Sequence, residues 1–148
     1  MQTISKSLDD TAEVAGTIIN TLRQKTEGGD KAVVVGLSGD LGSGKTTFSQ
    51  SAARILGVLE TVTSPTFIIE KVYHTKDTAF PQFIHIDAYR LDEAKELEVL
   101  GFKELLSQKG NLIFIEWPER VKEILPKDIF TIEFKFIDEH TRAISYDF

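Results

Sequence analysis

The feature that most constrains this chain is a glycine-rich loop between a strongly apolar run and an amphipathic segment. Residues 39–46 read GDLGSGKT, a full match to the phosphate-binding pattern G-x-x-x-x-G-K-[ST]. The preceding run, Lys31–Leu37, is rich in β-branched residues without alternation, which is typical of a strand covered on both faces. After the loop, Phe48, Ala52 and Leu56 recur at helical spacing. This order of strand, loop and helix predicts an α/β nucleotide-binding fold.

The residue types in the loop match what phosphate binding requires. Glycines let successive backbone N–H groups turn inward around an anion, and the N-terminus of the following helix adds a partial positive charge. Lys45 supplies an ammonium for the β- and γ-phosphates, and the Thr46 hydroxyl is placed to ligate Mg²⁺. We expect the following residues to bind a nucleoside triphosphate: Asp40, Leu41, Gly42, Ser43, Gly44, Lys45, Thr46 and Thr47.

Two apolar runs end in acidic residues that are candidates for the rest of the site. Phe83–Asp87 reads FIHID and Leu112–Glu116 reads LIFIE. Proteins with this loop place a carboxylate at the end of a neighbouring strand to hold Mg²⁺ directly or through water. We therefore expect one of Asp87 and Glu116 to hold the metal and the other to orient or deprotonate the attacking water. The residues themselves leave open which acid does which.

Residues beside these acids are open to more than one interpretation. His85 shares a strand face with Asp87; a packed structural histidine is favoured over a hydrogen bond near the site. Trp117, by strand alternation, is expected to point to the face opposite Glu116 and to pack in the core or on a contact surface.

The remaining sequence predicts a mixed β-sheet flanked by helices, with antiparallel additions. Ser7 is expected to cap a helix that ends before Gly28. Phe67–Thr75 and Phe80–Asp87 are expected to form a hairpin. Ile129–Ile137 and Ala143–Phe148 read as closing antiparallel strands. Since no repeat or linker divides residues 1–148, we expect a single domain with a P-loop NTPase-like α/β fold.

Composition excludes several other classes of protein. The 148 residues contain no cysteine, which removes disulfide scaffolds, thiolate zinc sites and cysteine nucleophiles. No apolar run approaches the ~18 residues that span a bilayer, and a signal-peptide pattern is absent, so a cytoplasmic protein without membrane contact is expected. The net charge of −6 disfavours direct binding to nucleic acid. The sequence also lacks an N-K-x-D motif, which favours ATP over GTP.

Four motifs together resemble one family. They are GDLGSGKTT at Gly39–Thr47, SPTF at Ser64–Phe67, HIDAYRL at His85–Leu91 and IEWPE at Ile115–Glu119. In this order and spacing they resemble the TsaE (YjeE) family, small bacterial P-loop ATPases of tRNA threonylcarbamoyladenosine biosynthesis. The last three motifs are more discriminating than the loop, and the resemblance spans nearly the whole chain.

The resemblance implies roles for individual residues, with ATP and Mg²⁺ as the bound species. Lys45 would be the phosphate lysine, and Thr46 with Glu116 would form the Mg²⁺ site. Asp87 would be the second acid that hydrolysis requires. Lys45, Asp87 and Glu116 are thus the catalytic residues implied by the resemblance.

The resemblance also implies a nucleotide-sensing loop and protein partners. Thr66 would respond to the γ-phosphate from a switch-like segment, and Thr11 would form part of the adenine pocket. The family binds the TsaB–TsaD complex, whose transferase modifies the adenosine beside the anticodon, so this chain would act on tRNA only indirectly through that complex.

Two other functions stay open from the residues alone. The first is a small-molecule kinase that uses the same loop; arginines scattered along the chain disfavour it, because a kinase would usually clamp phosphates with several together. The second is a nucleotide-gated binding module in which hydrolysis is incidental. Arg90 and Arg120 are candidates for an arginine finger acting within the chain.

Overall fold

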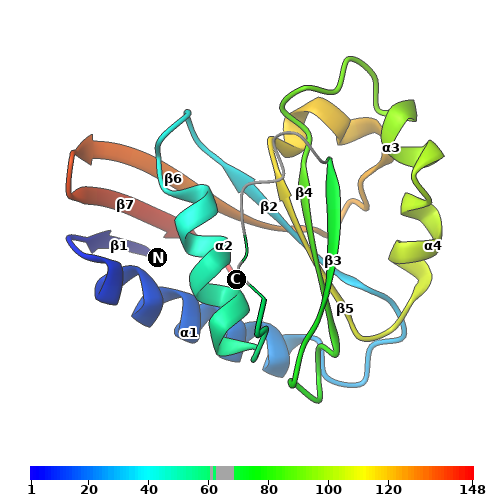
Figure 1. The fold of residues 1–148 in the computed structure, drawn as a ribbon, viewed down its shortest axis with the longest axis horizontal. Helices are drawn as coiled ribbons and strands as arrows, with labels where there is room; N and C mark the ends of the chain where they lie inside the picture. The colour runs from blue at the N-terminus through cyan, green and yellow to red at the C-terminus, as the bar shows by residue number, and fades with distance from the viewer. Residues whose placement is uncertain (61, 63–68) are drawn as a thin grey trace.

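The fold is a mixed sheet whose parallel centre carries the loop. The computed structural model describes residues 1–60, 62 and 69–148 (Figure 1). In this part of the chain the strands form one seven-stranded sheet in the order β1-β7-β6-β2-β5-β4-β3. The strands are β1 (Gln2–Ser5), β2 (Val33–Ser38), β3 (Glu70–His74), β4 (Gln82–Asp87), β5 (Asn111–Glu116), β6 (Phe130–Asp138) and β7 (Thr141–Tyr146). Neighbouring strands among β6, β2, β5 and β4 run parallel, while β3, β7 and β1 join antiparallel.

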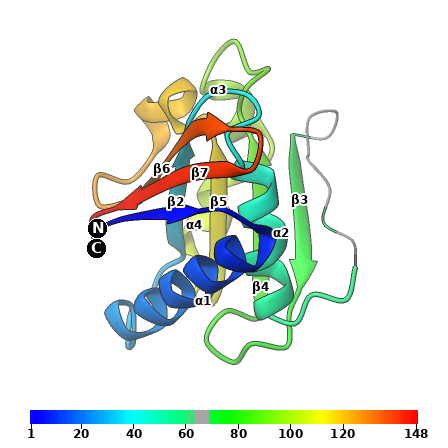
Figure 2. The same cartoon turned by 90° about the vertical axis from the view of Figure 1, so that its left-hand side faces the viewer.

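Helices cover both faces of this sheet. They are α1 (Leu8–Lys25), α2 (Lys45–Ile55), α3 (Lys95–Val99), α4 (Phe102–Ser107) and the 3₁₀ helix η1 (Pro118–Ile124). The helices α1 and α2 lie on one face, and α3 and α4 lie on the other (Figures 1 and 2). Each face has its own apolar core. This arrangement confirms the α/β fold class and the antiparallel additions expected from the sequence.

The central strands are apolar throughout because both of their faces are covered. Val33, Val35 and Leu37 of β2 pack in the core beneath α1 and α2, whereas Val34 packs in the core on the other face. Every residue of β5 is buried. Continuous burial explains why neither run alternates between apolar and polar residues.

Local signals at the ends of elements agree with the observed bounds. The Ser7 side chain accepts a hydrogen bond of 3.0 Å from the backbone N–H of Asp10 and so caps α1, as expected. The hairpin is formed by β3 and β4, although residues 67 and 68 of its expected first strand lie outside the described residues. The closing strands β6 and β7 pair antiparallel, and β6 also pairs parallel with β2. Within residues 1–60, 62 and 69–148, no helix is both long and apolar enough to cross a membrane.

Candidate nucleotide-binding site

The glycine-rich loop connects the end of β2 to the start of α2 and packs directly against β6. Gly39 has a φ of 150°, and a Cβ atom there would lie 2.5 Å from the Phe134 carbonyl oxygen and 2.7 Å from Ser43 Oγ. Gly44 precedes α2 with a φ of 106°. A side chain at position 39 would therefore push the loop away from the sheet. The glycine keeps the loop close to β6.

Lys45 follows this loop as the first residue of α2 and is 4% exposed. Its ammonium donates to the carbonyl oxygens of Gly39 and Asp40, the latter at 2.9 Å, and lies 3.5 Å from Ser43 Oγ. It also lies 4.6 Å from the centroid of the Trp117 ring. Burial lowers the pKa of Lys45, and the nearby carboxylates, with Glu116 foremost, oppose this shift. The cation is thus held by neutral acceptors, and an anion placed in the loop would be a stronger acceptor.

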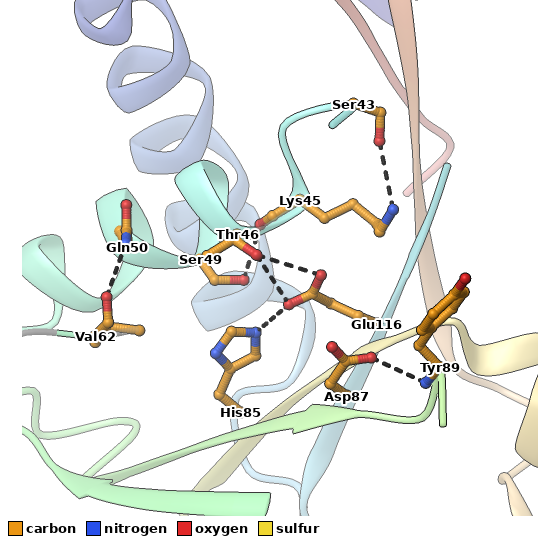
Figure 3. A network of polar contacts seen from close by, with 10 residues as sticks. All are labelled: Ser43, Lys45, Thr46, Ser49, Gln50, Val62, His85, Asp87, Tyr89 and Glu116. Atoms are coloured by element: carbon orange, nitrogen blue, oxygen red, sulfur yellow. Dashed lines mark hydrogen bonds and ion pairs between the residues drawn. The ribbon is translucent and has the colours of Figure 1, made fainter. Parts of the chain in front are cut away.

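Glu116 ends β5 and faces the first turn of α2 (Figure 3). Its two carboxylate oxygens lie 3.5 and 3.4 Å from Thr46 Oγ1. Oε2 also lies 2.7 Å from Nε2 of His85. His85 is fully buried and stacks on Phe83, which agrees with the favoured interpretation of a packed histidine. It also makes the hydrogen bond near the site that the alternative interpretation expected.

Asp87 ends β4 and pairs in register with Glu116 of the neighbouring strand. Its Oδ1 accepts a hydrogen bond of 2.9 Å from the backbone N–H of Tyr89. Burial raises the pKa of the Asp87 carboxyl, and the negative charge of Glu116 adds to this shift. Both acids therefore lie where the carboxyl ends of parallel strands meet, as their positions after two apolar runs predicted.

Two cavities meet at the loop. The first, of about 410 Å³, contains the space in front of Lys45. It is lined by residues 41–47, Asp87, Tyr89, Arg90, Glu116, Trp117 and Arg142. The second, of about 170 Å³, lies between the start of α1, the loop and the β6–β7 hairpin, and Thr11 is part of its lining. Both cavities are lined by Ser43, Gly44, Thr47 and Arg142, so they are neighbours across the start of α2.

The oxygen atoms of Thr46 and Glu116 suit Mg²⁺, which usually takes only one or two protein ligands and completes its coordination with phosphate and water oxygens. Among the residues with described positions, no three His, Asp or Glu side chains group closely enough to hold an ion. Thr46 Oγ1 and Glu116 Oε1 are 3.5 Å apart. Adjacent ligands at the 2.0–2.1 Å distances of octahedral Mg²⁺ would be about 2.9 Å apart, so a small shift fits both oxygens to one ion. Phosphate and water oxygens would supply the other ligands, as is usual for Mg²⁺.

Not every residue named from the sequence lies in these cavities. The Asp40 side chain is absent from the lining of the larger cavity, although its carbonyl oxygen accepts from Lys45. Thr66 lies outside the described residues. Thr11 lies in the smaller cavity, and its Oγ1 is 2.7 Å from Ser5 Oγ.

Tyr89, Trp117 and Arg142 line the larger cavity, although they were not expected there from the sequence. Trp117 packs against the core of the second face, as expected, yet its ring also contacts the site. The strand ends at Glu116 and Trp117 has a left-handed φ of 60°, so alternation does not extend to it. Arg142 comes from β7, nearly 100 positions from the loop. Its side chain passes close to Gly44, where a Cβ atom would lie 3.6 Å from Arg142 Cγ. No local sequence signal indicates this contact.

Comparisons with known proteins agree on one family. The family model described as threonylcarbamoyl adenosine biosynthesis protein TsaE matches residues 5–144. The tRNA threonylcarbamoyladenosine biosynthesis protein TsaE of Treponema pallidum (strain Nichols) is 37% identical over 145 residues, which cover 98% of each chain. The protein of the same name from Bacillus subtilis (strain 168) is 38% identical over 113 residues, which cover 76% of this chain and 68% of the relative. The crystal structure of Bacillus subtilis YdiB aligns with a TM-score of 0.72 at 25% identity, covering 99% of this chain and 83% of that one.

Proposed function

This chain belongs to the TsaE family of tRNA threonylcarbamoyladenosine biosynthesis proteins, and we propose that it is a Mg²⁺-dependent ATPase supporting the TsaB–TsaD threonylcarbamoyl transferase. One observation carries the proposal. An ammonium, a hydroxyl and two carboxylates, those of Lys45, Thr46, Asp87 and Glu116, line a single cavity beyond the ends of β2, β4 and β5. In open sheets of parallel strands, ligands bind in this position.

Lys45 is proposed to bind the β- and γ-phosphates. Its ammonium now donates to Gly39 and Asp40 carbonyl oxygens within the loop. Phosphate oxygens carry formal charge and compete well with neutral carbonyls for these donors. The backbone N–H groups at the start of α2 and the partial positive charge of this helix end add to the attraction. We infer that the triphosphate occupies the larger cavity.

Thr46 and Glu116 are proposed to hold Mg²⁺, which when bound neutralises charge that develops on the phosphates. Asp87 then remains free to orient the attacking water and accept its proton. Its raised pKa suits this role, because a more basic carboxylate is a better proton acceptor. The two acids thus divide the roles that the sequence left open.

The smaller cavity is proposed to take the nucleoside. Because the two cavities share the start of α2, a nucleotide whose phosphates lie in the larger one extends naturally into the smaller one. This places Thr11 near the base. We retain Thr66 as the proposed γ-phosphate sensor on the family resemblance alone.

The proposed partners follow from the family. The relatives are named for tRNA threonylcarbamoyladenosine biosynthesis, and this chain carries a net charge of −6 that opposes tight contact with tRNA. We therefore propose that it acts on tRNA through the TsaB–TsaD proteins. Direct, tight and salt-sensitive binding of tRNA by the isolated chain would contradict this part.

The chemistry is tested by following the γ-phosphate of ATP in the presence of the partner proteins. Lys45→Ala is expected to lower ATP turnover about 100-fold or more, because a preorganised charge on the transferring phosphoryl group is lost. Lys103→Ala is the matched control, since this lysine is exposed on α4 far along the chain from the loop. Unchanged turnover by Lys45→Ala would refute the proposal.

The product of this assay, together with the level of tRNA modification in cells, separates the alternatives. Phosphate recovered on a metabolite rather than in solution would establish a kinase. If Asp87→Asn and Glu116→Gln abolish hydrolysis yet leave tRNA modification in cells intact, the chain is a nucleotide-gated binding module. We expect inorganic phosphate as the product and loss of modification with both variants.

A further inference from the structure

Among the residues whose positions are described, His85 makes the shortest hydrogen bond to Glu116, a proposed ligand of Mg²⁺. It lies on β4 opposite Phe114 of β5, two positions before Glu116. Residues paired in register and residues two apart along a strand share a face of the sheet, so His85 and Glu116 lie on the same face. Nε2 of His85 lies 2.7 Å from Glu116 Oε2, whereas the contacts from Thr46 are 3.4 and 3.5 Å (Figure 3). The histidine therefore holds the carboxylate more firmly than the threonine does.

The ring of His85 is itself fixed by its surroundings. Its side chain is fully buried, and the ring stacks on Phe83 with centroids 6.3 Å apart and planes 22° apart. Phe83 in turn packs edge-to-face on Phe114 at 5.0 Å. A packed aromatic environment of this kind leaves the imidazole little freedom to rotate. The direction of its Nε2 towards Glu116 is thus built into the core.

The second ring nitrogen indicates which form of the imidazole is present. Nδ1 is buried and has no hydrogen-bond partner among the residues whose positions are described. A neutral ring protonated at Nε2 donates to Glu116 and leaves only an acceptor without a partner. Either alternative form would bury an unpaired N–H at Nδ1. The hydrogen-bond inventory therefore favours the neutral Nε2–H form.

We propose that His85 is a positioning residue that donates from Nε2–H to Glu116 Oε2 and so holds Oε1 of Glu116 in place for Mg²⁺. The inference rests on the proposed Mg²⁺-nucleotide function and adds a residue to it. Carboxylates that bind metals are commonly held by such outer contacts, and losing one typically lowers metal affinity or activity about 10–100-fold. We propose no direct contact of His85 with the nucleotide or with the attacking water. Its effect passes through Glu116.

The test compares two amides that differ only in reach. In His85→Gln the side-chain amide nitrogen can occupy a position like that of Nε2. The Asn side chain in His85→Asn is one methylene shorter, so its amide nitrogen reaches only the position of Nδ1. The affinity for Mn²⁺, used as a paramagnetic probe in place of Mg²⁺, is measured in the presence of ADP. We expect His85→Asn to weaken Mn²⁺ binding about 10–100-fold, and His85→Gln to stay within about threefold of the wild type.

A spectroscopic measurement on the wild type provides an independent readout. The chain has three histidines, His74, His85 and His140, so nitrogen-15 shifts of the imidazoles can be assigned with single variants. We expect His85 to carry its proton on Nε2. A proton on Nδ1 would overturn the inference even if neither variant folded.

The outcomes distinguish this inference from the function on which it depends. If the wild type binds no Mn²⁺ with ADP, the proposed function fails and this inference falls with it. If the wild type binds Mn²⁺ and His85→Asn binds it equally well, only the role of His85 is refuted. Equal loss of affinity in the Asn and Gln variants, both with wild-type free energy of unfolding, would also refute it.

Discussion

Replacing Gly39 by alanine tests whether the loop is held against β6 as described. The new Cβ would lie 2.5 Å from the Phe134 carbonyl oxygen, and the backbone φ of 150° is unsuited to a residue with a side chain. The strained backbone costs about 1–3 kcal/mol. Forcing an extra group into packed surroundings costs about another 1–3 kcal/mol. We therefore expect Gly39→Ala to lower the free energy of unfolding by about 4 kcal/mol, measured by urea denaturation.

Gly42 provides the matched control within the same loop. It also has a positive φ, of 77°, but a Cβ atom there would meet nothing within 4 Å. Gly42→Ala should therefore pay only for the backbone conformation, about 1–2 kcal/mol. Similar losses in the two variants would refute the argument, because the close approach to β6 would then contribute nothing.

Three further predictions concern charges in and beyond the site. Burial, and after it the charge of Glu116, raises the pKa of Asp87. The rate of ATP hydrolysis should therefore decrease as the pH is lowered, with the midpoint of this decrease above the ordinary aspartate pKa of about 3.9. A midpoint at or below that value would contradict the role of Asp87 as the proton acceptor. The emission of Trp117, the single tryptophan, should change when Mg²⁺-ATP is titrated in, because the Lys45 ammonium leaves its ring; constant emission at saturating nucleotide would count against this movement. Burial opposes the charge of Asp77, but hydrogen bonds led by that from Arg23 lower its pKa overall. Arg23→Met should therefore cost about 1 kcal/mol of unfolding free energy at pH 7. This difference should shrink as the pH falls below the ordinary aspartate value towards the lower folded-state pKa; a difference that stays constant over the whole acid range would refute the ion-pair explanation.

Much of the site was predictable because its signals are local. The loop at residues 39–46 is a contiguous pattern, and the positions of Asp87 and Glu116 follow from two apolar runs that end in acids. Since parallel strands meet at one edge of the sheet, the sequence could also predict that these acids gather near the loop. The structure places them in register on β4 and β5.

The remaining features depend on contacts that no local pattern encodes. Pairing of β6 with β2 brings Phe134 against Gly39, and β7 then carries Arg142 to the start of α2. These contacts arise from strand order, which hydrophobic periodicity does not specify. Trp117 was only partly predictable, because alternation holds only while a strand continues and β5 ends one residue earlier. For His85, its place in an apolar run predicted a packed side chain. The hydrogen bond to Glu116 could not be predicted without knowing that β5 lies beside β4.

We propose that Mg²⁺-ATP bound at this loop is hydrolysed in support of a transferase. The most direct measurement is the rate of phosphate release from ATP by the purified chain with Mg²⁺, alone and with purified TsaB–TsaD and tRNA. We predict slow release by the isolated chain and faster release when the complex and tRNA are added. The absence of phosphate release under every one of these conditions, with the chain folded, would refute the proposed ATPase function.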